Sequence, residues 1–556
     1  MKIQSVLPLL FLLALVACTP LPITPAWITP TLAPLPTPSP TPDLPPPVST
    51  PVDRQIVVLL PEPPDSLNPL YSRSWSARAT QGLFLAGLWH QDQRLDLLPE
   101  LAAEIPSLNN GGISADGKTM TIRLRADLTW SDGYPLTADD VLFTYEMALA
   151  PGNHLPSRFP YDAAVETVVV LDPQTVQVVF STPFAPWPTA LFPFILPRHV
   201  LEPVFALDGT LDRAVWNRMP AVGSGPFCYA GQEDEELVLD ANPLYWRGRP
   251  GIDRVRVRAV PDPVLRWAAV TEGQADLAPF LWPQVPFPLS APDGVQLFFS
   301  PSGYVETLLF NLDPRSGHPA LQDARVRTAI VQAIDRGVLC RSLQSGRAEP
   351  AASLLSGTVL ESPAQDVSSA SVDAAARQLD DAGWRDTDGD GIRDRAGTPL
   401  AFRFVVPAAG PERTAVVEML AAVGIGTWQL SPASPEPWND PNSWDLAQWA
   451  EQPAGYPDPD DPRWLCVEAR PGGNNPAGVC DEELDRLLAA QAATADPGER
   501  AGLLFQIQQL AREEGWWVPL CRWEDQWAVA EQLVGPSPWR GAPFWNVYQW
   551  EFERAE

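Results

Sequence analysis

A glycine-rich stretch at residues 112–119 has the spacing of a phosphate-binding loop. It reads Gly-Ile-Ser-Ala-Asp-Gly-Lys-Thr, and such a pattern binds phosphate when a strand precedes it and a helix follows it. The helix is needed because its amino-terminal amides and its dipole converge on the phosphate groups. Residues 119–125 instead alternate between polar and apolar, which predicts a strand. We therefore expect a hairpin turn at residues 115–118 and no nucleotide site.

A second stretch, residues 386–394, places carboxylates at alternate positions, as calcium loops do. They belong to Asp386, Asp388 and Asp390. An EF-hand also needs an apolar residue two positions after its glycine and a glutamate at loop position twelve. Here Ile392 follows the glycine directly, and position twelve is Gly397. A calcium-binding turn and an acidic turn without metal both stay open, and we assign no metal ligand.

The residues that usually carry catalysis are sparse. Neither a Gly-x-Ser-x-Gly turn nor a His-Glu-x-x-His helix occurs. Acidic pairs such as residues 139–140 and 380–381 fit helix starts and solvated faces. The histidines lack the spacing of metal ligands: His90, His154, His199 and His318. We expect no enzyme activity, no catalytic residue and no cofactor, while a secreted hydrolase with two distant carboxylates stays an alternative.

The amino terminus has the layout of a lipoprotein signal peptide. Lys2 gives a positive start, residues 6–16 are almost wholly apolar, and Ala17 precedes a cysteine. We expect cleavage after residue 17 and a diacylglyceryl group on Cys18. An ordinary signal peptide that happens to contain a cysteine is the alternative.

A proline-rich tether follows. Residues 19–51 contain 13 prolines among 33 residues, which excludes helix and sheet and favours extended polyproline geometry. At roughly 3.1 Å per residue, such a stretch reaches on the order of 100 Å. The sequence therefore predicts a domain held near a membrane yet free to move.

The cysteines suggest an oxidising compartment. With Cys18 lipidated, five of the six remain, so at least one is unpaired or joined to another chain. Cys466 and Cys480 bracket a loop rich in glycine and asparagine, and we expect a disulfide between them. Two buried thiols are the alternative there, and the pairing of the other three is open: Cys228, Cys340 and Cys521.

Size and charge narrow the class of protein. About 500 residues after the tether are too many for one core and suggest two lobes. The composition is that of a folded protein, with 45% hydrophobic residues. The net charge of −30 argues against nucleic acid or an anionic lipid surface as the ligand.

Strand and helix patterns alternate along the chain, which indicates a mixed α/β fold. Residues 128–141 read as a strand end, a turn at residues 131–133, and a helix capped by Thr137 with acidic residues in its first turn. Strands are expected at residues 55–60, 119–125, 167–171 and 176–180. Amphipathic helices are expected at residues 328–339, 371–382, 482–493 and 498–514.

The sequence of residues 128–141 resembles a block of the family 5 extracellular solute-binding proteins. The resemblance is carried by Trp-Ser-Asp-Gly-Tyr-Pro-Leu-Thr-Ala-Asp-Asp-Val. These are the peptide- and nickel-type receptors of bacterial ABC importers. Further short blocks also resemble this family, and they occur in the same order as in the family over nearly the whole mature chain. They are residues 64–69, 99–102, 222–227, 242–246, 272–276, 323–327 with 333–336, and 382–384.

The resemblance implies a two-lobed periplasmic-binding-protein-like fold of type II, in the large cluster with an extra subdomain and a hinge between the lobes. We expect a signal peptide at residues 1–17, the tether at 18–52, lobe I at 53–298 and 523–556, and lobe II at 299–522. The crossings between lobes are expected near residues 298–303 and 519–525.

The resemblance also implies a function that consists of binding and not of catalysis. We expect a monomeric, extracytoplasmic receptor that captures an oligopeptide-like solute between its lobes and delivers it to permease and ATPase subunits. It would lie in the periplasm or on the outer face of the cell membrane, with a lipid anchor as its membrane contact and no nucleic-acid partner. A sensor lipoprotein that kept the fold without transport is a further alternative.

The expected solute contacts come from two segments that the family places at its cleft, residues 65–75 and 444–458. Their aromatic and polar side chains suit stacking and hydrogen bonding to a solute: Asn68, Tyr71, Trp75, Trp449, Glu451 and Tyr456. In peptide-binding members an acidic residue precedes the last tyrosine, whereas this chain has Gly455. Oligosaccharides and other small solutes therefore stay open beside peptides.

Overall fold

The computed structural model describes residues 54–94, 96–282, 290–343, 347–358, 360–363, 370–405, 411–430, 440–451, 464–469, 475 and 477–553. The chain divides into two units at residue 52, and the description below concerns the second unit. The expected signal peptide, Cys18 and the tether lie outside the described residues.

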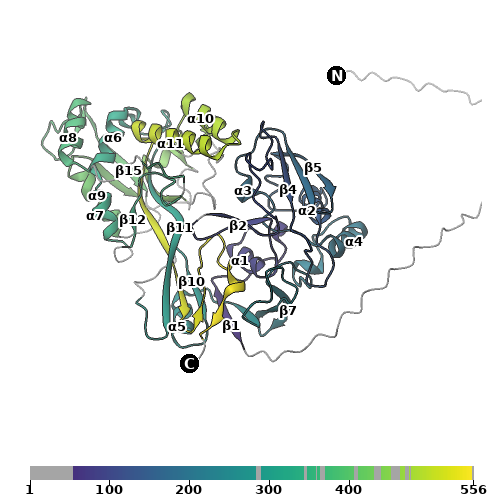
Figure 1. Ribbon diagram of the computed structural model, residues 1–556. Helices are drawn as coiled ribbons and strands as arrows, with labels where there is room; N and C mark the ends of the chain where they lie inside the picture. The colour runs from purple at the N-terminus through teal and green to yellow at the C-terminus, as the bar shows by residue number, and fades with distance from the viewer. Residues whose placement is uncertain are drawn as a thin grey trace, which may run out of the picture. The chain divides into compact units, whose positions relative to one another are not determined.

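A mixed sheet of eleven strands runs through the described part of this unit (Figure 1). Its order is β16-β15-β17-β11-β18-β10-β1-β9-β8-β7, with β12 paired to β18 at one side. The strands are β1 (Gln55–Leu60), β7 (Phe227–Glu233), β8 (Glu236–Ala241), β9 (Arg254–Ala259), β10 (Leu277–Phe280), β11 (Val295–Phe310), β12 (Glu349–Pro350), β15 (Ala401–Val405), β16 (Gly426–Leu430), β17 (Leu446–Glu451) and β18 (Trp517–Ala530).

Smaller sheets and helices surround this sheet. The smaller sheets pair β2 (Trp89–Gln91) with β3 (Leu97–Pro99), β4 (Thr119–Arg123) and β5 (Val165–Asp172) with β6 (Thr175–Phe180), β13 (Asp394–Arg395) with β14 (Thr398–Pro399), and β19 (Leu533–Val534) with β20 (Glu551–Phe552). The helices are α1 (Trp75–Phe84), α2 (Ala138–Leu149), α3 (Trp187–Ala190), α4 (Arg198–Asp208), α5 (Pro263–Thr271), α6 (Ala324–Ala333), α7 (Arg336–Arg341), α8 (Val372–Asp381), α9 (Pro411–Ala421), α10 (Glu482–Ala492) and α11 (Pro497–Glu514).

Separate hydrophobic cores define two lobes. The largest core is built by residues between Ile56 and Leu281 together with carboxyl-terminal residues such as Trp527 and Trp550, and a small cluster around α5 covers the sheet beside it. We call the part around these cores lobe I. Two further cores gather residues between Leu308 and Cys521, and we call that part lobe II. The expected mixed α/β fold is confirmed.

The two longest strands, β11 and β18, belong to both lobes. They pair antiparallel along most of their length, so that Val295 lies opposite Ala530 in lobe I and Leu309 lies opposite Trp517 in lobe II. The pairing is interrupted between Pro301 and Val305, where β11 bulges. A bulge bends a strand locally, so the chain has an irregular point where it passes between the lobes.

The turn and helix expected at residues 128–141 are present. Trp130 donates its backbone N–H to the Tyr134 carbonyl across the turn at 2.8 Å. Thr137 then caps α2 in a capping box, in which Asp140 accepts the Thr137 backbone N–H at 2.9 Å. This reciprocal pair satisfies amides that the first turn of a helix leaves unbonded.

The phosphate-loop-like stretch forms a hairpin, as expected. Gly117 has a left-handed φ of +68° and donates its N–H to the Ser114 carbonyl at 2.8 Å. β4 follows at Thr119 and pairs with β6. A strand therefore follows the loop, whereas a phosphate-binding loop leads directly into a helix.

The prediction of one continuous helix at residues 328–339 is wrong. The chain instead forms α6 and α7, with Ile334 in an extended conformation between them. Asp335 accepts the Val338 backbone N–H at 2.9 Å and caps α7. The apolar spacing continues across the break, but the aspartate competes with the helix backbone and starts a new helix.

Two disulfides are present among the described residues. Cys466 is bonded to Cys480, and Cys340 on α7 is bonded to Cys521 on β18, 181 residues away. Cys228 is a free thiol, and burial raises its pKa to about 11, so it is protonated at neutral pH.

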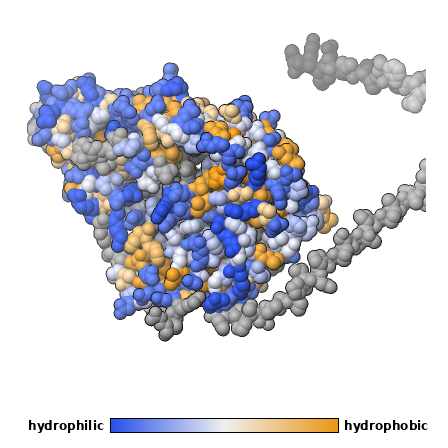
Figure 2. All heavy atoms as spheres, in the orientation of Figure 1, coloured by the Kyte–Doolittle hydropathy of each residue, from blue (hydrophilic) through white to orange (hydrophobic). Residues whose placement is uncertain are grey.

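Among the described residues, no helix is long and apolar enough to cross a bilayer. Figure 2 shows one face of the molecule, on which hydrophilic residues predominate and hydrophobic residues form scattered patches.

Candidate functional site at the hinge strands

The loop after β1 supplies three of the expected solute contacts. Asn68 is fully buried, and its Oδ1 accepts the Leu70 backbone N–H at 3.0 Å. Its Nδ2 donates to Oδ1 of Asn217 at 2.8 Å. The asparagine thus caps the short helix Pro69–Tyr71 and ties it to a second loop, which uses the polar atoms of its side chain within the protein.

Tyr71 is half-buried beside this loop. Its hydroxyl donates to Oδ1 of Asp212 at 3.0 Å. Burial raises the pKa of the Tyr71 hydroxyl, and the neighbouring Asp212 carboxylate raises it further. The hydroxyl therefore stays protonated and serves as a hydrogen-bond donor.

Trp75 begins α1 and points toward the carboxyl-terminal part of lobe I. Its Nε1 donates to the Arg540 carbonyl at 2.8 Å, and its ring centroid lies 6.1 Å from that of Trp527 on β18. Ser74 caps the helix through the Ala77 backbone N–H, which fixes where the tryptophan emerges. Trp75 is half-buried, so part of its ring stays available to a solute.

The second expected segment is β17 and the residues after it. Trp449 lies opposite Thr307 of β11 and packs against a lobe II core. Glu451 lies opposite Val305 at the end of the strand. The side chain of Glu451 lies outside the described residues, as do Gly455 and Tyr456.

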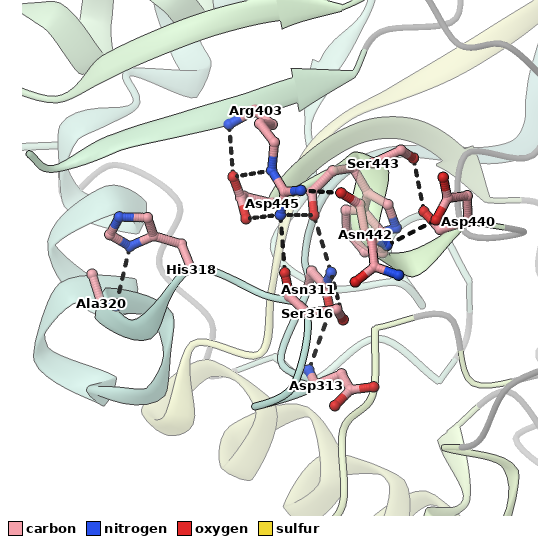
Figure 3. A network of polar contacts seen from close by, with 11 residues as sticks. Asn311, Asp313, Ser316, His318, Ala320, Arg403, Asp440, Asn442, Ser443 and Asp445 are labelled. Carbon is pink, nitrogen blue, oxygen red and sulfur yellow. Dashed lines mark hydrogen bonds and ion pairs between the residues drawn. The ribbon is translucent and has the colours of Figure 1, made fainter.

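An ion-pair network fixes the start of β17 (Figure 3). Arg403 on β15 donates from Nε and Nη2 to the two carboxylate oxygens of Asp445, at 2.9 and 2.7 Å. The same guanidinium donates to the Ser316 carbonyl at 2.9 Å, and Asn311 donates its Nδ2 to the Trp444 carbonyl at 3.0 Å. A bidentate arginine holds its partner in one orientation, so this network positions the strand that carries Trp449.

A cluster of aromatic rings lies where β11 and β18 pass between the lobes. Trp282 follows β10, Tyr304 lies in the β11 bulge, and Trp523 lies on β18. The Trp282 centroid is 4.9 Å from that of Tyr304 and 5.3 Å from that of Trp523. All three side chains are half-buried. Trp282 follows a lobe I strand, whereas Trp523 packs against a lobe II core, so the rings touch both lobes.

A buried ion pair supports these rings. Arg540 donates to both carboxylate oxygens of the fully buried Asp525, at 2.5 and 2.7 Å. Asp525 also accepts the Trp282 backbone N–H at 2.8 Å, and Arg540 lies 4.9 Å from the Tyr304 ring centroid. Burial raises the pKa of Asp525, and the Arg540 charge opposes that rise. We call these five residues the hinge cluster: Trp282, Tyr304, Trp523, Asp525 and Arg540.

The composition of the hinge cluster determines what it can do. Aromatic rings bind solutes by area and stacking, with little loss of conformational entropy. The arginine is hydrogen-bonded through Nε and Nη2 to Asp525 and through Nη2 to the Trp282 carbonyl, to which it donates at 2.9 Å. The arrangement therefore suits binding, in contrast to proton transfer or nucleophilic attack.

Part of this cluster could have been found from the sequence. Tyr304 and Trp523 lie in or beside the segments expected to cross between lobes, so aromatic residues there were a usable signal. Trp282 and Arg540 reach the same place from distant parts of the chain, and no local pattern marks them.

The acidic turn at residues 386–394 brings its carboxylates together at the surface. One oxygen from each of Asp386, Asp388 and Asp390 lies within 4.8 Å of the others. Each carboxylate also accepts a backbone amide of the same turn, as between Asp386 and Gly389 at 2.7 Å. The turn is thus held by its own hydrogen bonds, and both earlier alternatives fit it.

Comparison with curated proteins finds relatives over most of the chain. Protein XP55 of Streptomyces lividans is 28% identical over 476 residues, covering 82% of this chain and 81% of that protein. The oligopeptide-binding protein AppA of Bacillus subtilis is 25% identical over 515 residues, covering 88% and 89%.

Solved structures show the same fold. NikZ of Campylobacter jejuni, in complex with Ni(L-His), matches with a TM-score of 0.69 at 23% identity, covering 90% of this chain and all of that one. CtaP of Listeria monocytogenes matches with a TM-score of 0.74 at 21% identity, covering 90% and 99%. AppA in complex with a nonapeptide matches with a TM-score of 0.63 at 23% identity, covering 90% and 99%. The expected two-lobed fold of periplasmic solute-binding proteins is confirmed.

A family model settles the classification. The model of the bacterial extracellular solute-binding proteins, family 5 (Middle), matches residues 96–474, which include every block of the family resemblance except residues 64–69. The family consists of solute-binding proteins and not of enzymes. This chain belongs to family 5 of the bacterial extracellular solute-binding proteins.

Proposed function

We propose that this protein is the receptor of an ABC importer and captures an oligopeptide-like solute between its lobes. Its relatives include the oligopeptide-binding protein AppA and the dipeptide-binding protein of Escherichia coli, which is 26% identical over 267 residues. Permease and ATPase subunits would receive the solute.

The observation that carries this proposal is the pair of strands shared by the two lobes. β11 and β18 each contribute to a core in lobe I and to another in lobe II, and their pairing is irregular between Pro301 and Val305. Bending at such a point lets two rigid bodies open and close around a ligand. We take residues 53–298 and 523–556 as lobe I and residues 299–522 as lobe II.

The hinge cluster would supply part of the solute site. Trp75 is linked to this cluster through the Arg540 carbonyl. The three half-buried rings of the cluster pack against one another where β11 and β18 pass between the lobes. Trp449 would contribute from lobe II, and Tyr456, which lies outside the described residues, stays a predicted contact.

The direct test is to identify what the protein carries and to measure how the cluster contributes. Mass spectrometry after gentle denaturation would identify the co-purified solute, and calorimetry would give its Kd. Replacing Trp282 by alanine is expected to weaken binding by roughly tenfold or more, since a buried aromatic contact contributes about 1–3 kcal/mol. The matched control is Trp428→Ala, because Trp428 on β16 is 55% exposed and outside the cluster. Equal loss in both variants, or no solute under any condition, would contradict the proposal.

A second solute class is favoured by one position in the sequence. Gly455 stands where peptide-binding members of the family carry an acid, so a peptide ammonium group would lack that partner. Aromatic rings stack well on sugars, which makes an oligosaccharide the second candidate. Recovery of glycans in place of peptides by the same mass spectrometry would favour it.

The anchor belongs to the same proposal. A diacylglyceryl group on Cys18 would hold the monomeric receptor at the outer face of the membrane through the proline-rich tether. The Cys18→Ser variant is expected to leave the membrane fraction and appear in the soluble extracytoplasmic fraction. Unchanged membrane association of that variant would refute lipidation at this residue.

A further inference from the structure

The lobes also touch at a second place apart from β11 and β18, the turn between α10 and α11. The Ala185 backbone N–H of lobe I donates to the Ala492 carbonyl at the end of α10, at 3.1 Å. Ala495, in the turn itself, packs against the main core of lobe I. In Figure 1, α10 and α11 extend toward α3 of lobe I.

A buried arginine reinforces this contact. Arg500, in the first turn of α11, is 7% exposed and donates from Nη1 to the Ala185 carbonyl at 3.3 Å. Its Nε donates to Oε1 of the fully buried Gln491 on α10 at 3.1 Å. One guanidinium thus joins the two helices of lobe II and reaches a carbonyl of lobe I. Separating the lobes would remove a hydrogen bond from a buried charge, which is unfavourable.

The packing on the lobe I side is close. A Cβ placed on Gly117 would lie 2.9 Å from the Cβ of Ala495 and 3.0 Å from the Cβ of Pro183. The turn at residues 115–118 therefore fits against Ala495 only because residue 117 has no side chain. Two hydrogen bonds and a few apolar atoms make a contact weak enough to form and break repeatedly.

We propose that this contact is a latch that holds the lobes closed and sets how often the receptor opens without a solute. We call it the α10–α11 latch: Ala492, Ala495 and Arg500 against Gly117, Pro183 and Ala185. A solute can enter only when the lobes are open. The latch therefore sets the fraction of molecules that can bind a solute, and the apparent affinity falls in proportion to that fraction. The inference goes beyond the proposed function, because it concerns the protein alone.

Hydrogen exchange at the Ala185 amide measures directly how often the latch opens. The Ala185 N–H is bonded across the lobes when they are closed and meets water when they separate. In the full chain, Ala495→Asp is expected to speed exchange of this amide by about tenfold or more and to enlarge the radius of gyration in X-ray scattering, because a carboxylate cannot be buried against an apolar core without cost. The Phe192 amide, bonded to the Tyr161 hydroxyl within lobe I at 2.9 Å, is the internal reference and should not change.

The control places the same charge in the same turn on an exposed residue, in the variant Ala493→Asp. In this variant the Ala185 amide should exchange at the same rate as in the unaltered protein. A second pair tests the lobe I side: Gly117→Ala should open the lobes, while Gly111→Ala should not. Gly111 has a similar φ of +69° and open space around it, so backbone strain is matched.

Two results would overturn the latch. One is fast exchange of the Ala185 amide in the unaltered protein with no change in Ala495→Asp. The other is equal acceleration in Ala495→Asp and Ala493→Asp, which would mean local loosening of the turn. Because no solute is used, a failure of the proposed function leaves these outcomes unaffected.

Discussion

Glu100 offers the sharpest quantitative test of how lobe I is held together. Its Oε1 accepts the Tyr245 hydroxyl at 2.7 Å and the Trp246 Nε1 at 3.0 Å, and its Oε2 accepts the Arg247 Nη2 at 2.8 Å. His90 approaches the same Oε2 at 3.3 Å. The side chain of Glu100 is 8% exposed, so the change Glu100→Gln removes one buried charge from these hydrogen-bond and ion-pair partners.

The magnitude follows from the pKa of this group. Burial alone raises the pKa of Glu100, but the hydrogen bond from His90 and the charge of Arg247 outweigh it and lower the pKa from 4.5 to about 2. A fall of that size corresponds to about 3 kcal/mol of stability. Because the folded pKa is depressed, this contribution is complete above pH 4.5 and is lost as the pH falls toward 2.

We therefore expect Glu100→Gln to lower the free energy of unfolding by about 3 kcal/mol at pH 7, and by only about 1 kcal/mol near pH 3. Urea unfolding followed by near-ultraviolet circular dichroism would measure both. The matched control is Glu104→Gln, whose carboxylate is 49% exposed and lies 3.4 Å from Arg123. Exposed pairs contribute little, so a loss below about 0.5 kcal/mol is expected there. A pH-independent difference, or a loss at Glu100 no larger than at Glu104, would refute the reasoning.

Three further changes test other parts of the fold. Thr137→Ala removes the α2 cap and should lower the unfolding free energy by about 1 kcal/mol in denaturant titration; no loss would mean that the cap is dispensable. Gly223→Ala would place a Cβ 2.1 Å from the Phe84 carbonyl oxygen, so we expect a lower thermal midpoint and poor expression, and an unchanged midpoint would contradict the packing. Asp525→Asn leaves Arg540 without its charged partner in a buried site, which should cost about 3–5 kcal/mol and show as a lower midpoint in thermal unfolding monitored by tryptophan fluorescence.

The sequence predicted those features whose cause is local. The strand at residues 55–60, the α2 cap and the hairpin after residue 114 depend on side chains within a few positions, and the structure has all three. The break between α6 and α7 was missed because the apolar spacing runs through it, although Asp335 was a visible start signal. Competing local signals of this kind are decided by packing.

The candidate site was harder to predict because its members meet across the chain. The Arg540–Asp525 pair lies at the end of β10 only because three strands from distant segments assemble side by side. The sequence offered aromatic residues near the crossings but no sign that Trp282 would join them. Of the expected contacts, Trp75 lies next to the hinge cluster, whereas the side chain of Asn68 is hydrogen-bonded within the protein, to Leu70 of its own loop and to Asn217 of a second loop.

The position of β18 has a consequence for how the protein is made. This strand is near the end of the chain, yet it lies between β10 and β11 in the middle of the sheet. Because synthesis runs from the amino terminus, β10 and β11 each keep an unpaired edge until nearly the whole chain has been made. Unpaired edges invite association with other chains. A product truncated before residue 517 would therefore lack the strand that contributes to the cores of both lobes.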